Sequence, residues 1–183
     1  MRYFIIILLA TLSFVSKAQS VKITQSTKGE YISVEPIENK SIIKQFKIFN
    51  YKQFEDYLKT KDKSKTYVIN FWATWCAPCV KELPYFEKIN TDYASENVEV
   101  ILVSLDFPKQ IDTRLKPFLK DNKLQSEVVL LNDVDANTWI PKVNKDWSGA
   151  IPATLIYNSE KSEFYEQSFD YNDLENTLKT FLK

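Results

Sequence analysis

The two cysteines of this chain are Cys76 and Cys79, and they come shortly after a mainly apolar run over residues 67–72. A continuous apolar run of this length is typical of a β-strand that is covered on both faces. A strand that leads into a Cys-x-x-Cys at the first turn of a helix gives the geometry that lowers a thiol pKa and makes a disulfide exchangeable. The spacing therefore predicts thiol–disulfide exchange at a strand-to-helix junction.

A structural disulfide is the competing interpretation of this pair. Paired cysteines in an oxidising compartment usually form a disulfide that stabilises a small fold. However, a disulfide that closes so short a loop removes little chain entropy, so it stabilises a fold much less than one that closes a long loop. The chain has 183 residues, 44% of them hydrophobic, which is enough for one sizeable core without a staple. The redox interpretation is therefore favoured.

The composition excludes several other kinds of site. The chain contains no histidine, so it cannot by itself form a Ser-His-Asp or Cys-His catalytic site. Two thiolates without histidine provide only half of a tetrahedral zinc site, and we expect neither a metal nor another cofactor. Gly29 and Gly149 are the only glycines, which excludes the Walker A loop and the G-x-G-x-x-G nucleotide fingerprint.

The amino terminus predicts an export signal. Arg2 precedes an apolar stretch over residues 3–15, and small residues before Gln19 suit signal-peptidase cleavage. The stretch is shorter than the roughly 20 residues that span a bilayer, so we expect residues 1–18 to be a cleaved signal peptide rather than a membrane anchor. The mature protein is then expected to be periplasmic. Without Arg2 and Lys17 the formal net charge falls from zero to about −2, which gives no attraction to nucleic acid or anionic lipid.

Hydrophobic periodicity predicts alternating strands and helices after a flexible leader over residues 19–30. Strands are expected over residues 31–37, 42–49, 67–72, 98–105, 128–131, 153–157 and 163–169. Helices are expected after Asn50, from the cysteines to about residue 93 with a bend near Pro84, over 111–122 with a break or kink at Pro117, over 133–143, and over 171–182. This order predicts an α/β three-layer sandwich.

Several motifs in combination resemble the thioredoxin superfamily. They are the run Phe71-Trp72-Ala73-Thr74-Trp75-Cys76-Ala77-Pro78-Cys79, then Pro84, and then Gly149-Ala150-Ile151-Pro152-Ala153-Thr154. The run Val80-Lys81-Glu82-Leu83-Pro84 and the export signal are similar to the TlpA/ResA-like branch of exported disulfide reductases. The resemblance implies a thioredoxin-like domain over residues 48–183, with a mixed central sheet and helices on both faces. Residues 19–47 would be a leader and an N-terminal strand pair.

The resemblance also implies separate roles for the two thiols. Cys76 would be the attacking nucleophile, because the helix dipole and free amide groups at a helix N-terminus stabilise a thiolate. Cys79, one turn further along and more buried, would resolve the mixed disulfide. The residues between them, Ala77 and Pro78, influence the reduction potential, and this Pro-containing pair favours a reducing protein.

Four further residues would shape the surface around the thiols. In this superfamily the proline that matches Pro152 has a cis peptide bond, which would place the Ile151 backbone opposite the Cys76 sulfur, where it could pair with an extended partner chain. Trp75 would form part of an apolar rim. For Trp147 a place in that rim and a place in the core are both open.

Asn70 and Glu82 are the two positions at which we expect proton transfer to the thiols to differ from that in a cytosolic thioredoxin. Many cytosolic thioredoxins have a buried aspartate at the position of Asn70, so one candidate base is missing here. Glu82 lies about one helical turn after Cys79, and the matching glutamate of ResA-like proteins influences the thiol pKa. The alternative for Glu82 is a solvated position on the outer face of the helix.

These observations predict an exported, monomeric thiol:disulfide oxidoreductase that reduces disulfides in client proteins. The resemblance implies apocytochrome c among the clients and a membrane thiol carrier as the electron donor. Two alternatives stay open. One is a thiol peroxidase on the same fold, although such sites have a nearby arginine and Arg114 is distant in sequence. The other is a non-catalytic module that keeps the dithiol for binding only.

Overall fold

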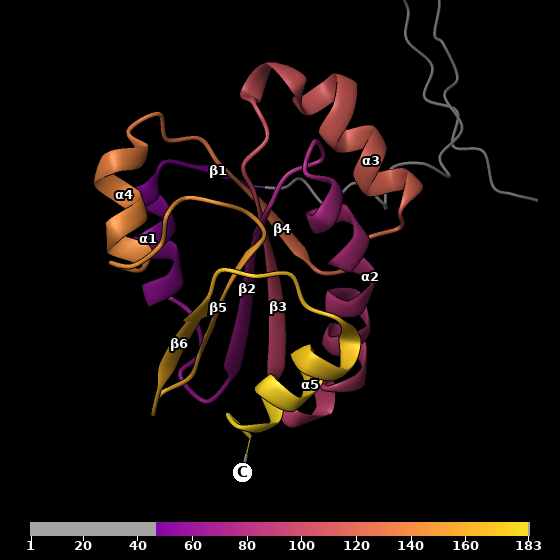
Figure 1. The fold of residues 1–183 in the computed structure, drawn as a ribbon, viewed down its shortest axis with the longest axis vertical. Helices are drawn as coiled ribbons and strands as arrows, with labels where there is room; N and C mark the ends of the chain where they lie inside the picture. The colour runs from indigo at the N-terminus through magenta and orange to yellow at the C-terminus, as the bar shows by residue number, and fades with distance from the viewer. Residues whose placement is uncertain (1–46, 183) are drawn as a thin grey trace, which may run out of the picture. The chain divides into compact units, whose positions relative to one another are not determined.

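Six strands form one mixed β-sheet in the computed structural model, which describes residues 47–182 (Figure 1). The strands are β1 Lys47–Phe49, β2 Thr66–Trp72, β3 Val98–Ser104, β4 Glu127–Leu131, β5 Ala153–Tyr157 and β6 Ser162–Tyr165. Their order across the sheet is β1-β4-β3-β2-β5-β6. Strands β1 to β4 run parallel to one another, whereas β5 is antiparallel to β2 and to β6. The predicted mixed sheet is confirmed.

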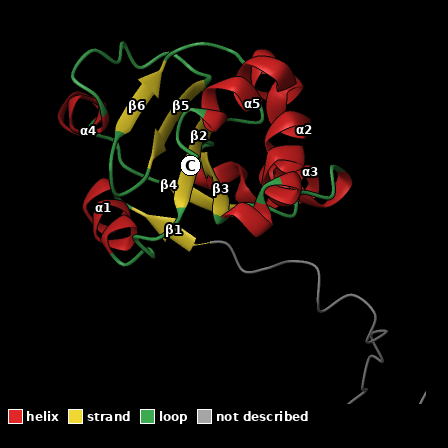
Figure 2. Ribbon diagram, turned by 90° about the horizontal axis from the view of Figure 1, so that it is seen from below, coloured by secondary structure: helices red, strands yellow, loops and turns green. Residues whose placement is uncertain are grey.

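Helices cover both faces of this sheet, as Figure 2 shows along its edge. The α-helices are α1 Tyr51–Lys59, α2 Ala77–Asp92, α3 Lys116–Asp121, α4 Ala136–Val143 and α5 Tyr171–Lys179. Helices α2, α3 and α5 lie on one face, and α1 and α4 lie on the other. The three-layer α/β sandwich expected from the sequence is therefore the observed architecture.

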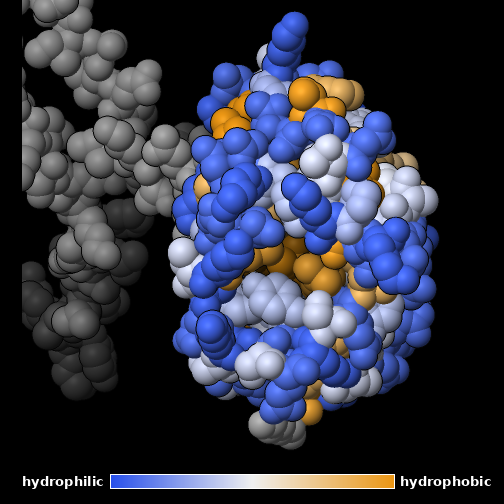
Figure 3. Space-filling model, turned by 90° about the vertical axis from the view of Figure 1, so that its left-hand side faces the viewer, coloured by the Kyte–Doolittle hydropathy of each residue, from blue (hydrophilic) through white to orange (hydrophobic). Residues whose placement is uncertain are grey.

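Strand β2 is buried along its whole length and separates two hydrophobic cores. Side chains alternate along a strand, so Val68 and Trp72 join the core under α2 and α5, whereas Ile69 and Phe71 join the core under α1 and α4. Each such side chain, when fully buried, contributes about 1.5–3 kcal/mol. Seen from the side of α4 and β6, the surface is mainly hydrophilic around one apolar hollow (Figure 3).

Local sequence explains several helix ends. Asn50 caps α1 as predicted, because its side chain accepts from the Gln53 amide at 2.9 Å while the Gln53 side chain accepts from the Asn50 amide at 3.0 Å. The irregularity expected at Pro117 is also present. The chain changes there from a π-helical turn, Ile111–Leu115, to α3, and Pro117 takes a first-turn position where its missing N–H costs nothing.

Several predicted elements are shorter than expected, among them the closing helix, which ends at Lys179, and for two of them the cause is visible. The helix predicted from residue 133 begins at Ala136, because the Asp133 carboxylate instead holds the preceding loop by accepting from the Tyr51 and Asp135 amides. The strand predicted over 163–169 ends at Tyr165. Beyond it, Glu166 and Phe169 form hydrogen bonds toward the loop before β5 and toward α2, so the chain leaves the sheet.

Part of the sequence-based prediction lies outside the described residues. This part comprises the signal peptide over 1–18, the leader over 19–30 and the strand over 31–37. Of the strand expected over 42–49, the described residues form β1, which pairs in parallel with β4 at the edge of the central sheet. Across residues 47–182, no helix has the length and apolar character needed to cross a membrane.

Candidate active site

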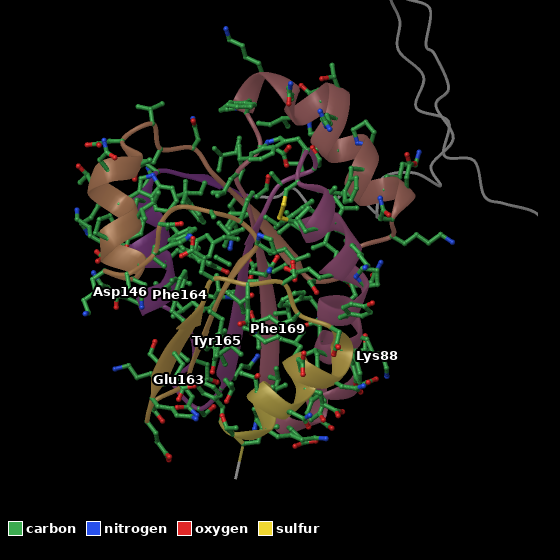
Figure 4. The ribbon with its side chains drawn as sticks, viewed as in Figure 1. Lys88, Asp146, Glu163, Phe164, Tyr165 and Phe169 are labelled. Atoms are coloured by element: carbon green, nitrogen blue, oxygen red, sulfur yellow. A yellow bond between two sulfur atoms is a disulfide. The ribbon has the colours of Figure 1, made fainter. Side chains whose placement is uncertain are left out.

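Cys76 and Cys79 lie where the sequence predicts, at the junction between β2 and α2. Cys76 is the N-cap residue of α2, and the Cys79 amide donates to its sulfur at 3.3 Å. The two cysteines form a disulfide, visible as the yellow bond near the start of α2 in Figure 4. Cys79 is fully buried and Cys76 is 6% exposed, so of the two sulfurs only that of Cys76 is accessible from solvent.

The loop before β5 approaches the same sulfur. The Ile151–Pro152 peptide bond is cis, as predicted. The Ile151 carbonyl oxygen lies 3.7 Å from Cys76 Sγ. A backbone edge thus lies directly beside the reactive sulfur, where an extended chain that binds Cys76 could form main-chain hydrogen bonds.

Two side chains fasten this loop, Trp147 from within it and Glu166 from beyond β6. The Trp147 indole donates to the Ala150 carbonyl at 2.8 Å. The Glu166 carboxylate accepts from the Ser148 amide at 3.0 Å, from the Ala150 amide at 3.2 Å and from the Ser148 hydroxyl, and the bonds from Ser148 lower the pKa of Glu166. Gly149, which lies between Ser148 and Ala150, has φ of +93°, a conformation that other residues rarely adopt. Sequence reasoning missed Glu166, because no local pattern links it to the loop.

Trp147 itself belongs to the core, which decides between its two predicted positions. It is 5% exposed and packs against the rings of Phe71, Trp139 and Phe164, with centroids 4.9–5.5 Å apart. Trp75, in contrast, is 47% exposed beside Cys76. Only Trp75 can therefore contribute its ring to the rim around the disulfide.

The loop before Cys76 is held by a buried carboxylate that sequence reasoning also missed. Asp106 is 2% exposed and follows β3. It accepts from the Thr74 amide at 3.1 and 3.2 Å, from the Thr74 hydroxyl at 2.5 Å and from the Ser104 hydroxyl at 2.9 Å. The signal that could have found it is an acidic residue just beyond a buried strand next to the Cys-x-x-Cys strand. Arg114 also reaches this loop, with Nη2 3.4 Å from the Thr74 carbonyl oxygen.

Glu82 is buried beside the disulfide, not solvated on the outer face of α2. It is 1% exposed, and its oxygens accept from Asn70 Nδ2 at 2.9 Å and from the Phe169 amide at 2.8 Å. Burial raises the pKa of Glu82 from 4.5 to about 7, against the opposing effect of these two hydrogen bonds. Asn70 Nδ2 also donates to Thr154 Oγ1 at 3.2 Å, across the β2–β5 pair. A carboxyl group that titrates near neutral pH thus lies one turn from Cys79.

The structure brings most of the predicted site residues together. Grouped at this end of the sheet are Asn70, Trp75, Cys76, Ala77, Pro78, Cys79, Glu82, Ile151 and Pro152. Ala77 and Pro78 are exposed in the first turn of α2, where Pro78 needs no hydrogen-bond acceptor. Within residues 47–182, no three acidic or cysteine side chains are grouped in a way that could hold a metal ion. The chemistry that this arrangement supports is exchange at sulfur.

Comparison with known proteins gives a family and a set of relatives. The AhpC/TSA family matches residues 39–162. Sporulation thiol-disulfide oxidoreductase A of Bacillus subtilis is 35% identical over 69 residues, which are 38% of this chain and 42% of the relative. Thiol-disulfide oxidoreductase ResA of Bacillus thuringiensis is 36% identical over 74 residues, which are 40% of this chain and 41% of the relative. The matched segments thus span about two-fifths of these curated relatives.

Solved structures share the fold. A thiol:disulfide interchange protein from Chlorobium tepidum has a TM-score of 0.54 at 21% identity, covering 64% of this chain and 80% of that one. The thioredoxin domain of a thiol-disulfide oxidoreductase from Bacteroides vulgatus has a TM-score of 0.53 at 23% identity, covering 66% and 81%. These structures have the same thioredoxin-like arrangement of sheet and helices.

Proposed function

This chain belongs to the AhpC/TSA family of thioredoxin-like proteins, and on that basis we propose that it is a thiol:disulfide oxidoreductase that reduces disulfides in client proteins. The observation that carries the proposal is the Cys76–Cys79 disulfide at the N-terminus of α2, with the Ile151 carbonyl 3.7 Å from the Cys76 sulfur. The names of the curated relatives agree with this activity.

The reaction begins from the reduced dithiol. The Cys76 thiolate attacks one sulfur of a client disulfide, a new S–S bond forms, and the second client sulfur leaves as a thiolate. Cys79 then loses its proton and attacks the Cys76 sulfur. The mixed disulfide breaks, the Cys76–Cys79 disulfide forms, and the client departs with two thiols. Two electrons and two protons pass to the client, and an external dithiol restores the reduced protein.

The surroundings of each thiol support this division of work. Cys76 is the only one of the two with exposed surface, and it lies at the positive end of the α2 dipole, which favours its thiolate. Cys79 has no exposed surface, so a client sulfur cannot reach it directly. It can react only with the sulfur already held at Cys76.

Glu82 is the proposed proton acceptor for Cys79. A carboxyl group with a pKa of about 7 can take a proton and release it near neutral pH. Asn70 can form a hydrogen bond with the Glu82 carboxyl group in either of its protonation states. Its NH2 group donates to the ionised carboxylate, and its carbonyl oxygen, which has no hydrogen-bond partner among the described residues, can accept from the protonated acid after an amide flip.

We also propose the compartment, the client and the electron donor of the reaction. The signal pattern over residues 1–18 supports export to the periplasm, with the thioredoxin-like domain over 48–183 as the functional part. Apocytochrome c is a proposed client, and a membrane thiol carrier is the proposed electron donor of the monomeric protein. The basis for these assignments is the likeness of the motif region to ResA-type oxidoreductases.

The test uses Cys76→Ser and Cys79→Ser with a disulfide-bonded peptide and an excess of a dithiol donor. Turnover should fall below about 1% of the wild-type rate in both variants, because each removes one of the two exchange steps. Cys79→Ser should accumulate a mixed disulfide with the client, and Cys76→Ser should not. Ala94→Ser, an exposed change beyond the far end of α2, is the control and should react normally. Wild-type turnover in either cysteine variant contradicts the proposal.

The same preparation tests the peroxidase alternative. The structure brings Arg114 to the loop before Cys76, which removes one objection to it. However, the residue three positions before Cys76 is Ala73, where peroxidatic sites have threonine. Consumption of hydrogen peroxide by the reduced protein faster than reduction of the peptide disulfide would replace the reductase proposal with a peroxidase.

A further inference from the structure

Two large exposed hydrophobic side chains lie at the same end of the sheet as the disulfide. Trp75 follows β2, and Phe107, which is 62% exposed, follows β3. Strands β2 and β3 are parallel neighbours, with Trp72 opposite Ser104, so their carboxyl ends open onto the same edge. Single exposed apolar side chains are common on protein surfaces, whereas apolar side chains grouped next to a reactive group are typical of a binding site.

A buried carboxylate joins the two loops that carry these rings. Asp106 directly precedes Phe107, and Thr74 directly precedes Trp75. The Thr74 amide and hydroxyl both donate to Asp106, at 3.1 and 2.5 Å. Because Asp106 is 2% exposed, this connection is shielded from water, and burying a charge is costly unless it is hydrogen-bonded. The two rings are therefore presented on loops that are held together.

The disulfide has different neighbours on its two sides. Strand β2 lies between β3 and β5 in the sheet. On the β5 side, the Ile151 carbonyl offers a backbone acceptor beside Cys76. On the β3 side lies the loop that follows β3, where the Phe107 side chain is exposed. A chain that lies over Cys76 therefore meets a hydrogen-bonding edge in one direction and an apolar surface in the other.

We propose that Trp75 and Phe107 form an apolar shelf that binds a hydrophobic side chain of the client, on one side only of the client's reactive cysteine. This inference rests on the proposed function and adds a substrate preference to it. Neighbouring strands are about 4.8 Å apart and an extended chain advances about 3.3 Å per residue, so the shelf lies one or two residues from the bound cysteine. The preferred client is thus an extended segment with an apolar residue at that spacing.

The two other large exposed hydrophobic residues of the described chain are not part of this shelf. Val134 follows β4, one strand further away, and its neighbour Asp133 is bonded to the Tyr51 amide of α1. Ile48 lies in the edge strand β1 and is 50% exposed. Ile48 therefore provides a matched control, with similar exposure and no contact with the disulfide loops.

The test measures kcat/KM for a set of short disulfide-bonded peptides. Each carries leucine or serine one or two residues before or after the reactive cysteine. For the wild type we expect about a tenfold preference for leucine over serine on one side of the cysteine and none on the other, as expected for partial burial of one such side chain. In Phe107→Ser the preference should fall to about twofold or less, and Phe107→Leu should restore most of it. Ile48→Ser should keep both the preference and the rates.

Three results would overturn the shelf: an equal preference on both sides, no preference in the wild type, or an unchanged preference in Phe107→Ser. Each leaves the proposed function intact, provided that the wild-type protein reduces the peptides and Cys76→Ser does not. Failure of the wild type to reduce any peptide disulfide would instead contradict the proposed function.

Discussion

Adjacent residues of β2 face two regions with opposite chemistry. The Asn70 side chain points to the α2 and α5 face, where it bonds to the buried Glu82 carboxyl and to Thr154. Phe71 points to the α1 and α4 face, where it packs between Phe54 and Trp147. One face of the sheet thus holds a titratable group next to the disulfide, and the other face holds closely packed rings.

This difference indicates how the chain accommodates a buried acid. A carboxyl group with a pKa near 7 is costly to ionise in the core, and hydrogen bonds from Asn70 and Phe169 offset only part of that cost. The aromatic core on the other face has no such cost. We infer that both faces contribute to stability and that only the α2 face also sets the reactivity. The following predictions test that separation, from the largest expected effect to the smallest.

Phe71→Ala should have the largest effect on stability. It leaves a cavity between Phe54 and Trp147 and should lower the free energy of unfolding by about 3–5 kcal/mol. Phe71→Leu, the more conservative change, should cost clearly less. Urea denaturation of the oxidised protein measures both. In whatever fraction remains folded, the pH dependence of Cys76 alkylation should match the wild type, and a shift in that profile would show that the two faces are coupled.

Glu82→Gln should remove a pH dependence of stability. The pKa of Glu82 is raised in the folded protein, from 4.5 to about 7, so the folded state retains a proton that the unfolded state releases. Wild-type stability should therefore fall as pH rises through that interval, by up to about 3 kcal/mol. The variant has no ionisable group there, so its unfolding free energy should change less between pH 5 and pH 8.

The control for this measurement is Glu96→Gln, which changes an exposed glutamate beyond the end of α2. Urea titrations of the oxidised proteins at both pH values avoid any contribution from thiol ionisation. An equal pH dependence in Glu82→Gln and in the wild type would mean that Glu82 is not the group responsible, and its proposed role as proton acceptor would lose its support.

Glu166→Ala should have the smallest effect, confined to client capture. The change removes the hydrogen bonds to Ser148 and Ala150 that hold the loop before Ile151, so the carbonyl beside Cys76 becomes less well fixed. We expect kcat/KM for a peptide disulfide to fall about fivefold. The matched control is Glu163→Ala, in β6, where the glutamate bonds to Tyr165 and Lys161 instead (Figure 4). Equal losses in both variants would exclude a specific role for Glu166.

Sequence reasoning was most successful where the signal is local. The strand over 67–72, the helix that begins at the cysteines and the Asn50 cap each depend on neighbouring residues, and the structure has all three. The cis bond at Pro152 followed from resemblance and is also present. Element ends were less well predicted, as at Asp133 and Glu166, because side chains there bond to partners distant in sequence.

By itself, the sequence determined the chemistry available to this protein: one Cys-x-x-Cys at a strand-to-helix junction, with no histidine to support another mechanism. Only the tertiary structure decided what surrounds the two sulfurs. It buries Glu82 against Asn70, assigns Trp147 to the core and joins Asp106 to the loop of Trp75. The physical reason is that burial and hydrogen bonding depend on which strands become neighbours. Strand partners lie 32 positions apart in the β2–β3 pair and 82 to 90 positions apart in the β2–β5 pair, so these contacts form only when the strands pair.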